Sequence, residues 1–168
     1  MKVCIVSDSH DRADALASAV RQAAAQGAEA VIHCGDVIGT QTLGGALSAG
    51  LTMHVIHGNN LGDPISLARW ARDSNGKLHY HGPDARLELG GRKVFVVHYP
   101  EYGYAMACTG DWDLVCCGHS HHAGVEQVAN VKGDKTWLVN PGTVAGLAAP
   151  STWVLADLAA MRFDTRFL

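Results

Sequence analysis

Short apolar runs alternate with helical patterns along the first part of the chain. Val3–Ser7, Ala30–Cys34 and Met53–His57 are apolar runs that lead into polar turn residues, which predicts three buried β-strands. Between the first two, apolar residues recur at helical spacing over Ala13–Gln26, and Gly27 ends that segment. The alternation of strand and helix is typical of α/β proteins.

Two further helices are expected around the third strand. Thr40–Ala49 is rich in small residues and predicts a weak helix that ends at Gly50. Pro64 suits the first turn of another helix, and the residues after it, through Ala71, have a core-facing apolar spacing.

The pattern changes to hairpins in the second part of the chain. Pairs of strand-like runs are joined by glycine-containing or short polar turns, with one helix and one buried strand among them. The predicted strands are Ala85–Leu89, Lys93–His98, Leu114–Cys117, Val125–Val131, Thr136–Val139, Trp153–Leu158 and Met161–Leu168, and the helix is Tyr102–Cys108. This order favours one α/β domain over residues 1–168, built from two packed sheets flanked by helices.

Composition narrows the class of protein. The chain has 168 residues with 13 Lys and Arg against 16 Asp and Glu, so we expect no dedicated nucleic-acid surface. No apolar run approaches the roughly 20 residues that cross a bilayer, so no membrane contact is expected. The start, MKVCIVSDSH, is typical of a buried strand rather than a signal peptide, which favours the cytoplasm and five free thiols.

The ten histidines point to a site, because several follow predicted strands. In layered α/β folds, the loops at the carboxyl ends of strands meet at one rim, where ligands bind. Seven oxygen and nitrogen donors lie in such positions: Asp8, His10, Asp36, Asn59, His98, His119 and His121.

This donor set predicts metal chemistry. Carboxylate, imidazole and amide oxygen together suit Mn, Fe, Zn, Co or Ni. Seven ligands exceed what one tetrahedral site uses, so two ions that share a carboxylate fit better. Two such ions can hold a hydroxide and clamp a phosphoryl group for in-line attack, which is the chemistry of a two-metal hydrolase.

The same residues stand in an ordered series of motifs. Asp8-Ser9-His10, Gly35-Asp36, Gly58-Asn59, His98 and Gly118-His119-Ser120-His121 resemble the five blocks of the calcineurin-like metallophosphoesterase superfamily. Asn140-Pro141-Gly142-Thr143 resembles the NPGS segment of its small single-domain phosphodiesterase branch.

The resemblance implies a fold, a ligand set and an activity. The fold would be a four-layer β-sandwich of two sheets flanked by helices. One metal would be bound by Asp8, His10 and His121, and the other by Asn59, His98 and His119, with Asp36 as the bridge. Manganese would be the preferred ion, with nickel, iron, zinc or cobalt as alternatives. The activity would be hydrolysis of phosphodiesters or phosphomonoesters.

The sequence departs from the family pattern after Asn59. Many relatives have histidine at the next position, or cysteine in the small branch, whereas this chain has Asn60. Asn60 is expected to stabilise the phosphoryl oxygens, but an amide cannot protonate a leaving group at neutral pH. That proton would come from water, His57, Asp63 or His122.

A second departure is His98-Tyr99-Pro100, where relatives commonly have His-Gly. Tyr99, Tyr102 and Tyr104 would then lie near the rim, where they either stack on a ring of the substrate or cap the core.

We expect structural rather than catalytic roles for most of the remaining polar residues. His33 and His54 are expected to be hydrogen-bonded residues of apolar strands, and His79 and His81 to lie in a solvated loop. Asp11 is expected to cap the following helix. For His57, a role in orienting a ligand and a structural role both stay open.

We therefore expect a metal-dependent phosphoesterase acting on a small phosphate ester, with a homodimer through the late hairpins as one arrangement. The alternative is a scaffold of the same superfamily that binds proteins through its surface. A scaffold has no need of metal ligands, so the seven filled donor positions favour the enzyme.

Overall fold

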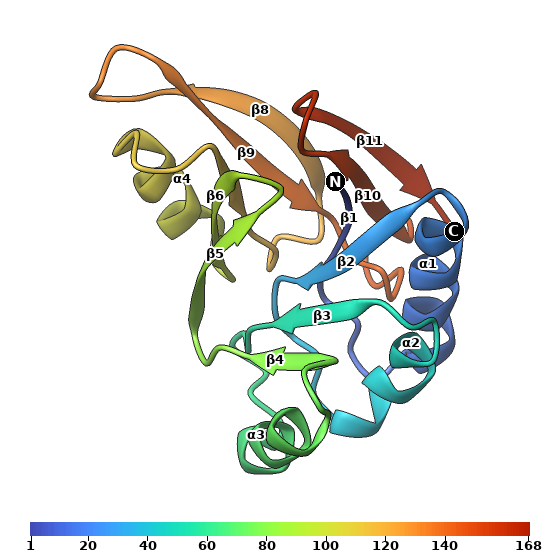
Figure 1. The fold of residues 1–168 in the computed structure, drawn as a ribbon. Coiled ribbons are helices and arrows are strands. Elements are labelled where there is room, and N and C mark those ends of the chain that lie inside the picture. The colour runs from blue at the N-terminus through green and yellow to red at the C-terminus, as the bar shows by residue number, and fades with distance from the viewer.

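Two β-sheets pack face to face in the computed structural model, which describes residues 1–168 (Figure 1). The first sheet has six strands in the order β11-β10-β1-β2-β3-β4. Its strands are β1 (Lys2–Val6), β2 (Ala28–His33), β3 (Thr52–Val55), β4 (Leu78–Tyr80), β10 (Thr152–Asp157) and β11 (Arg162–Phe167). Strands from both ends of the chain therefore meet in this sheet.

The second sheet has five strands in the order β5-β6-β7-β9-β8. Its strands are β5 (Asp84–Leu89), β6 (Arg92–Val97), β7 (Leu114–Cys116), β8 (Ala123–Ala129) and β9 (Lys135–Pro141). The predicted hairpins β5–β6 and β8–β9 are confirmed as antiparallel pairs.

Helices cover the outer faces of both sheets. Residues of α1, α2 and α3 pack with the outer face of the first sheet, and α4 packs on the second. The helices are α1 (Ala13–Ala25), the 3-10 turn η1 (Thr40–Leu43), α2 (Gly44–Leu47), α3 (Pro64–Asp73) and α4 (Pro100–Cys108). The layers therefore run helix, sheet, sheet, helix, as expected for the four-layer sandwich.

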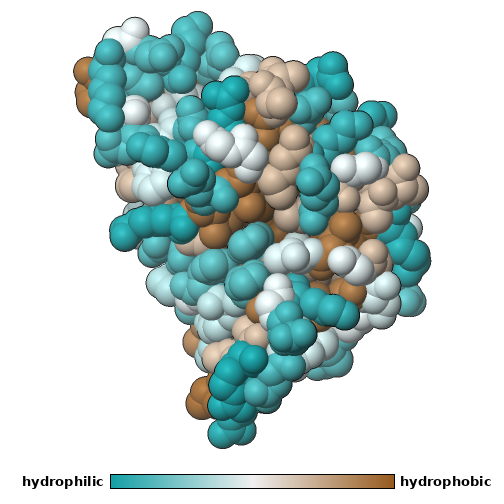
Figure 2. Space-filling view, viewed as in Figure 1, coloured by the Kyte–Doolittle hydropathy of each residue, from teal (hydrophilic) through white to brown (hydrophobic).

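The core between the sheets explains the apolar strand runs. Ile5, Ile32, Val94, Val139 and Val154 belong to one buried cluster that joins the two inner faces. A strand buried on both faces must be apolar at nearly every position, as β1 is. In Figure 2, brown apolar side chains gather in the middle of the face shown and are framed by hydrophilic residues.

Strand direction brings the polar loops together. β1, β2 and β3 are parallel in the first sheet, and β6, β7 and β9 are parallel in the second. The carboxyl ends of each set therefore meet at one edge, so the loops that follow these strands share a rim.

Three elements differ from the expected ones. The predicted loop with His79 contains the short strand β4, which pairs with β3. The predicted helix Thr40–Ala49 is split between η1 and α2, consistent with its two adjacent glycines. The predicted helix Tyr102–Cys108 begins earlier, at Pro100, because proline suits a first helical turn. No helix is long and apolar enough to cross a bilayer.

Candidate metal centre

The seven predicted ligands lie at the rim, on both sides of the seam between the sheets. The first sheet contributes the residues after β1, β2 and β3, and the second contributes those after β6 and β7. In that order they are Asp8, His10, Asp36 and Asn59, followed by His98, His119 and His121.

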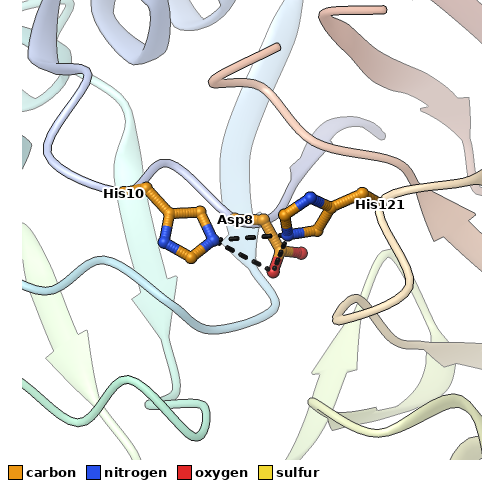
Figure 3. A group of neighbouring side chains, drawn as sticks. All are labelled: Asp8, His10 and His121. Atoms are coloured by element: carbon orange, nitrogen blue, oxygen red, sulfur yellow. Dashed lines mark hydrogen bonds and ion pairs between the residues drawn. The ribbon is translucent and has the colours of Figure 1, made fainter. Parts of the chain in front are cut away.

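A first group of donors forms a compact triangle (Figure 3). Asp8 Oδ1 lies 3.2 Å from His121 Nε2 and 3.7 Å from His10 Nε2. The two imidazole nitrogens are 3.3 Å apart. Ligands held at about 2.1 Å from one ion are themselves about 3.0–3.4 Å apart, so this triangle has the size of a single metal site.

Asp8 supplies a further test of whether a cation fits. The residue is fully buried, and its Oδ2 accepts a hydrogen bond from the His119 backbone N–H at 3.0 Å. Oδ1, by contrast, is buried and has no hydrogen-bond partner in the protein. A buried carboxylate oxygen without a donor is costly. A divalent cation between Oδ1 and the two imidazoles would satisfy it.

A second group of donors converges on Asn59. Its side-chain oxygen lies 3.0 Å from His98 Nε2 and 2.8 Å from His119 Nδ1. Both distances are in the range expected between two ligands of one ion.

Asp36 lies between the two groups and faces both. Its Oδ2 is 3.7 Å from His10 Nε2, and its Oδ1 is 3.4 Å from His98 Nε2. One carboxylate oxygen is thus directed to each group, which is the geometry that a bridging ligand needs.

Backbone carbonyls orient two of the imidazoles. His98 Nδ1 donates to the Cys34 carbonyl at 2.8 Å, and His121 Nδ1 donates to the Leu147 carbonyl at 2.8 Å. Since a carbonyl can only accept, the proton is on Nδ1 and the Nε2 lone pair is free. That lone pair is directed to the centre, as required of a metal ligand.

His33 supports the ligand loops from within the core. The Gly35 N–H donates to His33 Nδ1 at 3.3 Å, so Nε2 carries the proton and donates to Ser9 Oγ at 3.0 Å. Burial, followed by the neighbouring His98, lowers the pKa of His33 to about 3. The expected hydrogen-bonded core role is confirmed, and the bonds join the β1 and β2 loops.

The backbone at the rim is strained. Five of the seven predicted ligands have a left-handed φ: Asp8 at 53°, His10 at 40°, Asp36 at 57°, His119 at 66° and His121 at 61°. Such conformations cost about 1–3 kcal/mol each and concentrate at functional sites. The strain is held by the bonds that tie the loops together.

The Asn140–Thr143 segment provides several of those bonds. Asn140 Nδ2 donates to the Gly118 carbonyl at 2.8 Å and to Ser120 Oγ at 3.0 Å. Thr143 Oγ1 donates to the Asp8 carbonyl at 3.0 Å. The segment therefore fixes the loop that holds His119 and His121 as well as the loop that holds Asp8.

Gly58 allows the second donor group to form. A Cβ at this position would lie 2.6 Å from His98 Nε2 and would also clash with Asp36 Oδ1. Only glycine lets the β3 loop pass this close to both side chains.

Asn60 contacts Asp36. Its backbone N–H donates to Asp36 Oδ1 at 2.9 Å, and its Nδ2 donates to Oδ2 at 2.6 Å. The residue is exposed at the open side of the centre. An amide nitrogen carries two hydrogens, so one remains for another acceptor.

The predicted helix cap at Asp11 is wrong. Helix α1 has no side-chain cap, and Arg12 occupies the cap position. The Asp11 carboxylate instead accepts bonds from the Gly39 N–H at 2.7 Å and from Thr42 Oγ1 at 2.8 Å. It fastens the β1 loop to the segment after β2.

A cavity of about 330 Å³ opens next to the second donor group. Its lining includes Gly58, His98, Tyr99 and Tyr102. Tyr102 is 59% exposed and Tyr104 is 54% exposed, so neither caps the core. The Tyr99 ring packs edge-on against His119 at 4.7 Å between centroids.

Three candidate proton donors can be compared by their surroundings. Asp63 caps α3, and hydrogen bonds from Ser66 lower the pKa of its carboxyl group. Asp63 is therefore ionised. Burial lowers the pKa of His57, whose Nδ1 is hydrogen-bonded to the Tyr80 hydroxyl. His122 is exposed, with Nδ1 hydrogen-bonded to the Ser120 carbonyl at 2.6 Å.

Residues 1–161 match the calcineurin-like phosphoesterase superfamily domain, and the chain belongs to this family. Phosphodiesterase MJ0936 of Methanocaldococcus jannaschii is 28% identical over 148 residues, which cover 87% of this chain and 86% of that protein.

Solved structures have the same fold. The structure of a novel archaeal phosphodiesterase superposes with a TM-score of 0.89 at 26% identity, and the match covers 100% of both chains. Vps29 from Entamoeba histolytica has a TM-score of 0.64 at 15% identity, covering 100% of this chain and 99% of that one.

Proposed function

We propose that this protein hydrolyses phosphodiester bonds with the help of two divalent metal ions, and that manganese is the preferred ion. The observation that carries the proposal is the buried, unpartnered Asp8 Oδ1, toward which two imidazole nitrogens converge. The 28% identity to a phosphodiesterase over most of both chains supports the same reaction.

Divalent ions at such a centre supply Lewis-acid activation of water and offset the charge of the phosphoryl oxygens. The residues of this chain hold and orient them. Asp8, His10 and His121 would hold one ion, and Asn59, His98 and His119 the other, with Asp36 between. Carboxylate, amide and imidazole donors together suit manganese.

Asn60 would act on the phosphoryl group. One hydrogen of its amide is bonded to Asp36 Oδ2, and the other is available to a phosphoryl oxygen at the open side of the centre. Since Asp63 is ionised and His57 has a lowered pKa, the leaving group would be protonated by water or His122. Substrates with good leaving groups need this proton least.

The cavity beside His98 suits a small ester. Its volume of about 330 Å³ and its tyrosines would accommodate one ring of a substrate rather than a large polymer. The exposed Tyr102 is free to stack on that ring.

The scaffold alternative has less support. Vps29 is similar in fold at 15% identity, and that likeness concerns the fold alone. A protein that only docks partners gains nothing from a buried, unpartnered carboxylate oxygen or from left-handed backbone at five donor residues.

The test uses protein stripped with a chelator and assayed on bis-p-nitrophenyl phosphate with Mn, Ni, Zn or Mg added. We expect turnover to return with Mn, and Asp8→Asn to lower it by at least 100-fold. Asp134→Asn, in the β8–β9 turn, serves as the charge-matched control and should keep full activity. Stoichiometric metal binding without turnover in any of the four metals would rule out the phosphodiesterase proposal.

A further inference from the structure

Three histidines outside the centre lie together at the free edge of the first sheet. His54 in β3 is directly paired with His79 in β4, and His81 follows two residues later. Residues two apart on an extended strand point to the same face. The pairing of the two strands therefore places all three imidazoles side by side.

The rings are in contact. His54 stacks on His79 with 5.0 Å between centroids and on His81 with 5.3 Å, and His79 and His81 are 6.2 Å apart. His54 Nδ1 is 3.1 Å from His81 Nε2. No carboxylate lies within ion-pair distance of these three rings, so no ion pair accounts for the cluster.

The environment keeps His54 and His81 neutral. Burial, followed by the neighbouring His81 and His79, lowers the pKa of His54 to about 4. Burial, followed by the nearby His79, also lowers the pKa of His81. Neutral imidazole is the form that binds metal.

The two closest nitrogens are separated by the distance expected between two ligands of one ion. Two nitrogens at 2.0–2.1 Å from one metal are about 3.0–3.4 Å apart, and His54 Nδ1 and His81 Nε2 fall within that range. His79 is exposed, so its side chain can rotate off the His54 ring to give a third nitrogen. His79 in β4, His81 just beyond it and His54 in the neighbouring β3 would then give a three-nitrogen set with an open fourth position.

We propose that His54, His79 and His81 form a binding site for one transition-metal ion, separate from the Asp8–Asp36 centre. Three imidazoles without a carboxylate suit zinc, nickel or copper, whereas the mixed donors of the rim suit manganese as well. The edge site is therefore expected to bind zinc but not manganese, whereas the donors of the rim can bind either ion.

The experiment counts zinc ions bound per chain, by competition with a chromophoric chelator in the presence of saturating manganese. His79→Gln/His81→Gln is compared with Lys77→Gln, which alters an exposed residue beside β4 and leaves all three imidazoles in place. We expect wild type and Lys77→Gln to bind one zinc more per chain than the double variant. Manganese-supported hydrolysis should be equal in all three proteins.

A single variant guards against misfolding. His79 is exposed, so His79→Gln is expected to fold normally and to bind the edge zinc at least tenfold more weakly. Cobalt in place of zinc should give the visible absorption of a four-coordinate nitrogen site, and His79→Gln should change it. Equal zinc stoichiometry and affinity in wild type and both histidine variants would overturn the proposal, whatever the hydrolytic activity proves to be.

Discussion

Replacing Asp36 with asparagine is expected to stabilise the metal-free protein while removing about half or more of its response to metal. The side chains of Asp8 and Asp36 are both buried, and a carboxylate oxygen of one lies within 4.8 Å of an oxygen of the other. At an effective dielectric constant of about 20, two like charges at that distance repel by about 3.5 kcal/mol. Asp36→Asn removes this repulsion with little change in volume.

Part of this gain in the free energy of unfolding is lost because one hydrogen bond is broken. The new amide nitrogen would face Asn60 Nδ2, which now donates to Asp36 Oδ2 at 2.6 Å, and the lost bond costs about 1.5 kcal/mol. The net gain is about 2 kcal/mol, or a rise of about 4–8 °C in the melting temperature of a chain of this size. Each ion, at a free concentration of 100 times its Kd, adds about 2.7 kcal/mol to the free energy of unfolding of wild type. The variant should lose about half or more of this metal-dependent increase.

Thermal unfolding of both proteins, with excess chelator and with excess manganese, measures the two effects. Asp134→Asn controls for the loss of one carboxylate elsewhere, and it should match wild type in both conditions. A lower melting temperature of metal-free Asp36→Asn would refute the argument from repulsion. A full manganese-dependent rise in that variant would refute the bridging geometry.

Three further predictions concern neighbouring residues. Between pH 7.5 and pH 5, metal-free wild type should lose about 2 kcal/mol of stability through His33, because its unfolded imidazole takes up a proton near pH 6.5 while the folded pKa stays at about 3. In urea unfolding, His33→Gln should lose about 2 kcal/mol less stability than wild type between these two pH values. An equal loss in the two proteins would contradict the prediction. Gly58→Ala should reduce bound manganese from two ions to one, since its Cβ would lie 2.6 Å from His98 Nε2, whereas Gly124→Ala, which meets nothing within 4 Å, should keep both. Asn60→His should raise the turnover of alkyl phosphodiesters relative to p-nitrophenyl esters, and an unchanged ratio would show that leaving-group protonation does not limit the rate.

The strands and the rim were predictable because both follow from local patterns. Buried strands such as β1 are apolar throughout, and the donors that follow them must meet wherever the strands run parallel. The ordered motifs then fixed which side chains belong together.

Contacts that depend on exact pairing were not predictable in this way. β4 has only three residues, and His79 within it and His81 after it suggested a loop, so the alignment of His79 with His54 emerged only from the sheet. The Asp11 carboxylate satisfies a distant backbone N–H rather than its own helix, and no local pattern distinguishes these outcomes. Asn60 was assigned to the site, but its bonds to Asp36 depend on the path of the β3 loop.

The position of the rim across the two sheets has a consequence for the cohesion of the molecule. Below the rim, the sheets are held together by apolar side chains such as Ile5 and Val94, whose contribution does not require bound metal. At the rim, ions bound by residues of both sheets would act as cross-links, and their binding free energy would resist separation of the sheets. The ease with which this end of the sandwich opens would then be set by the supply of metal, whereas the opposite end would open only with the whole fold.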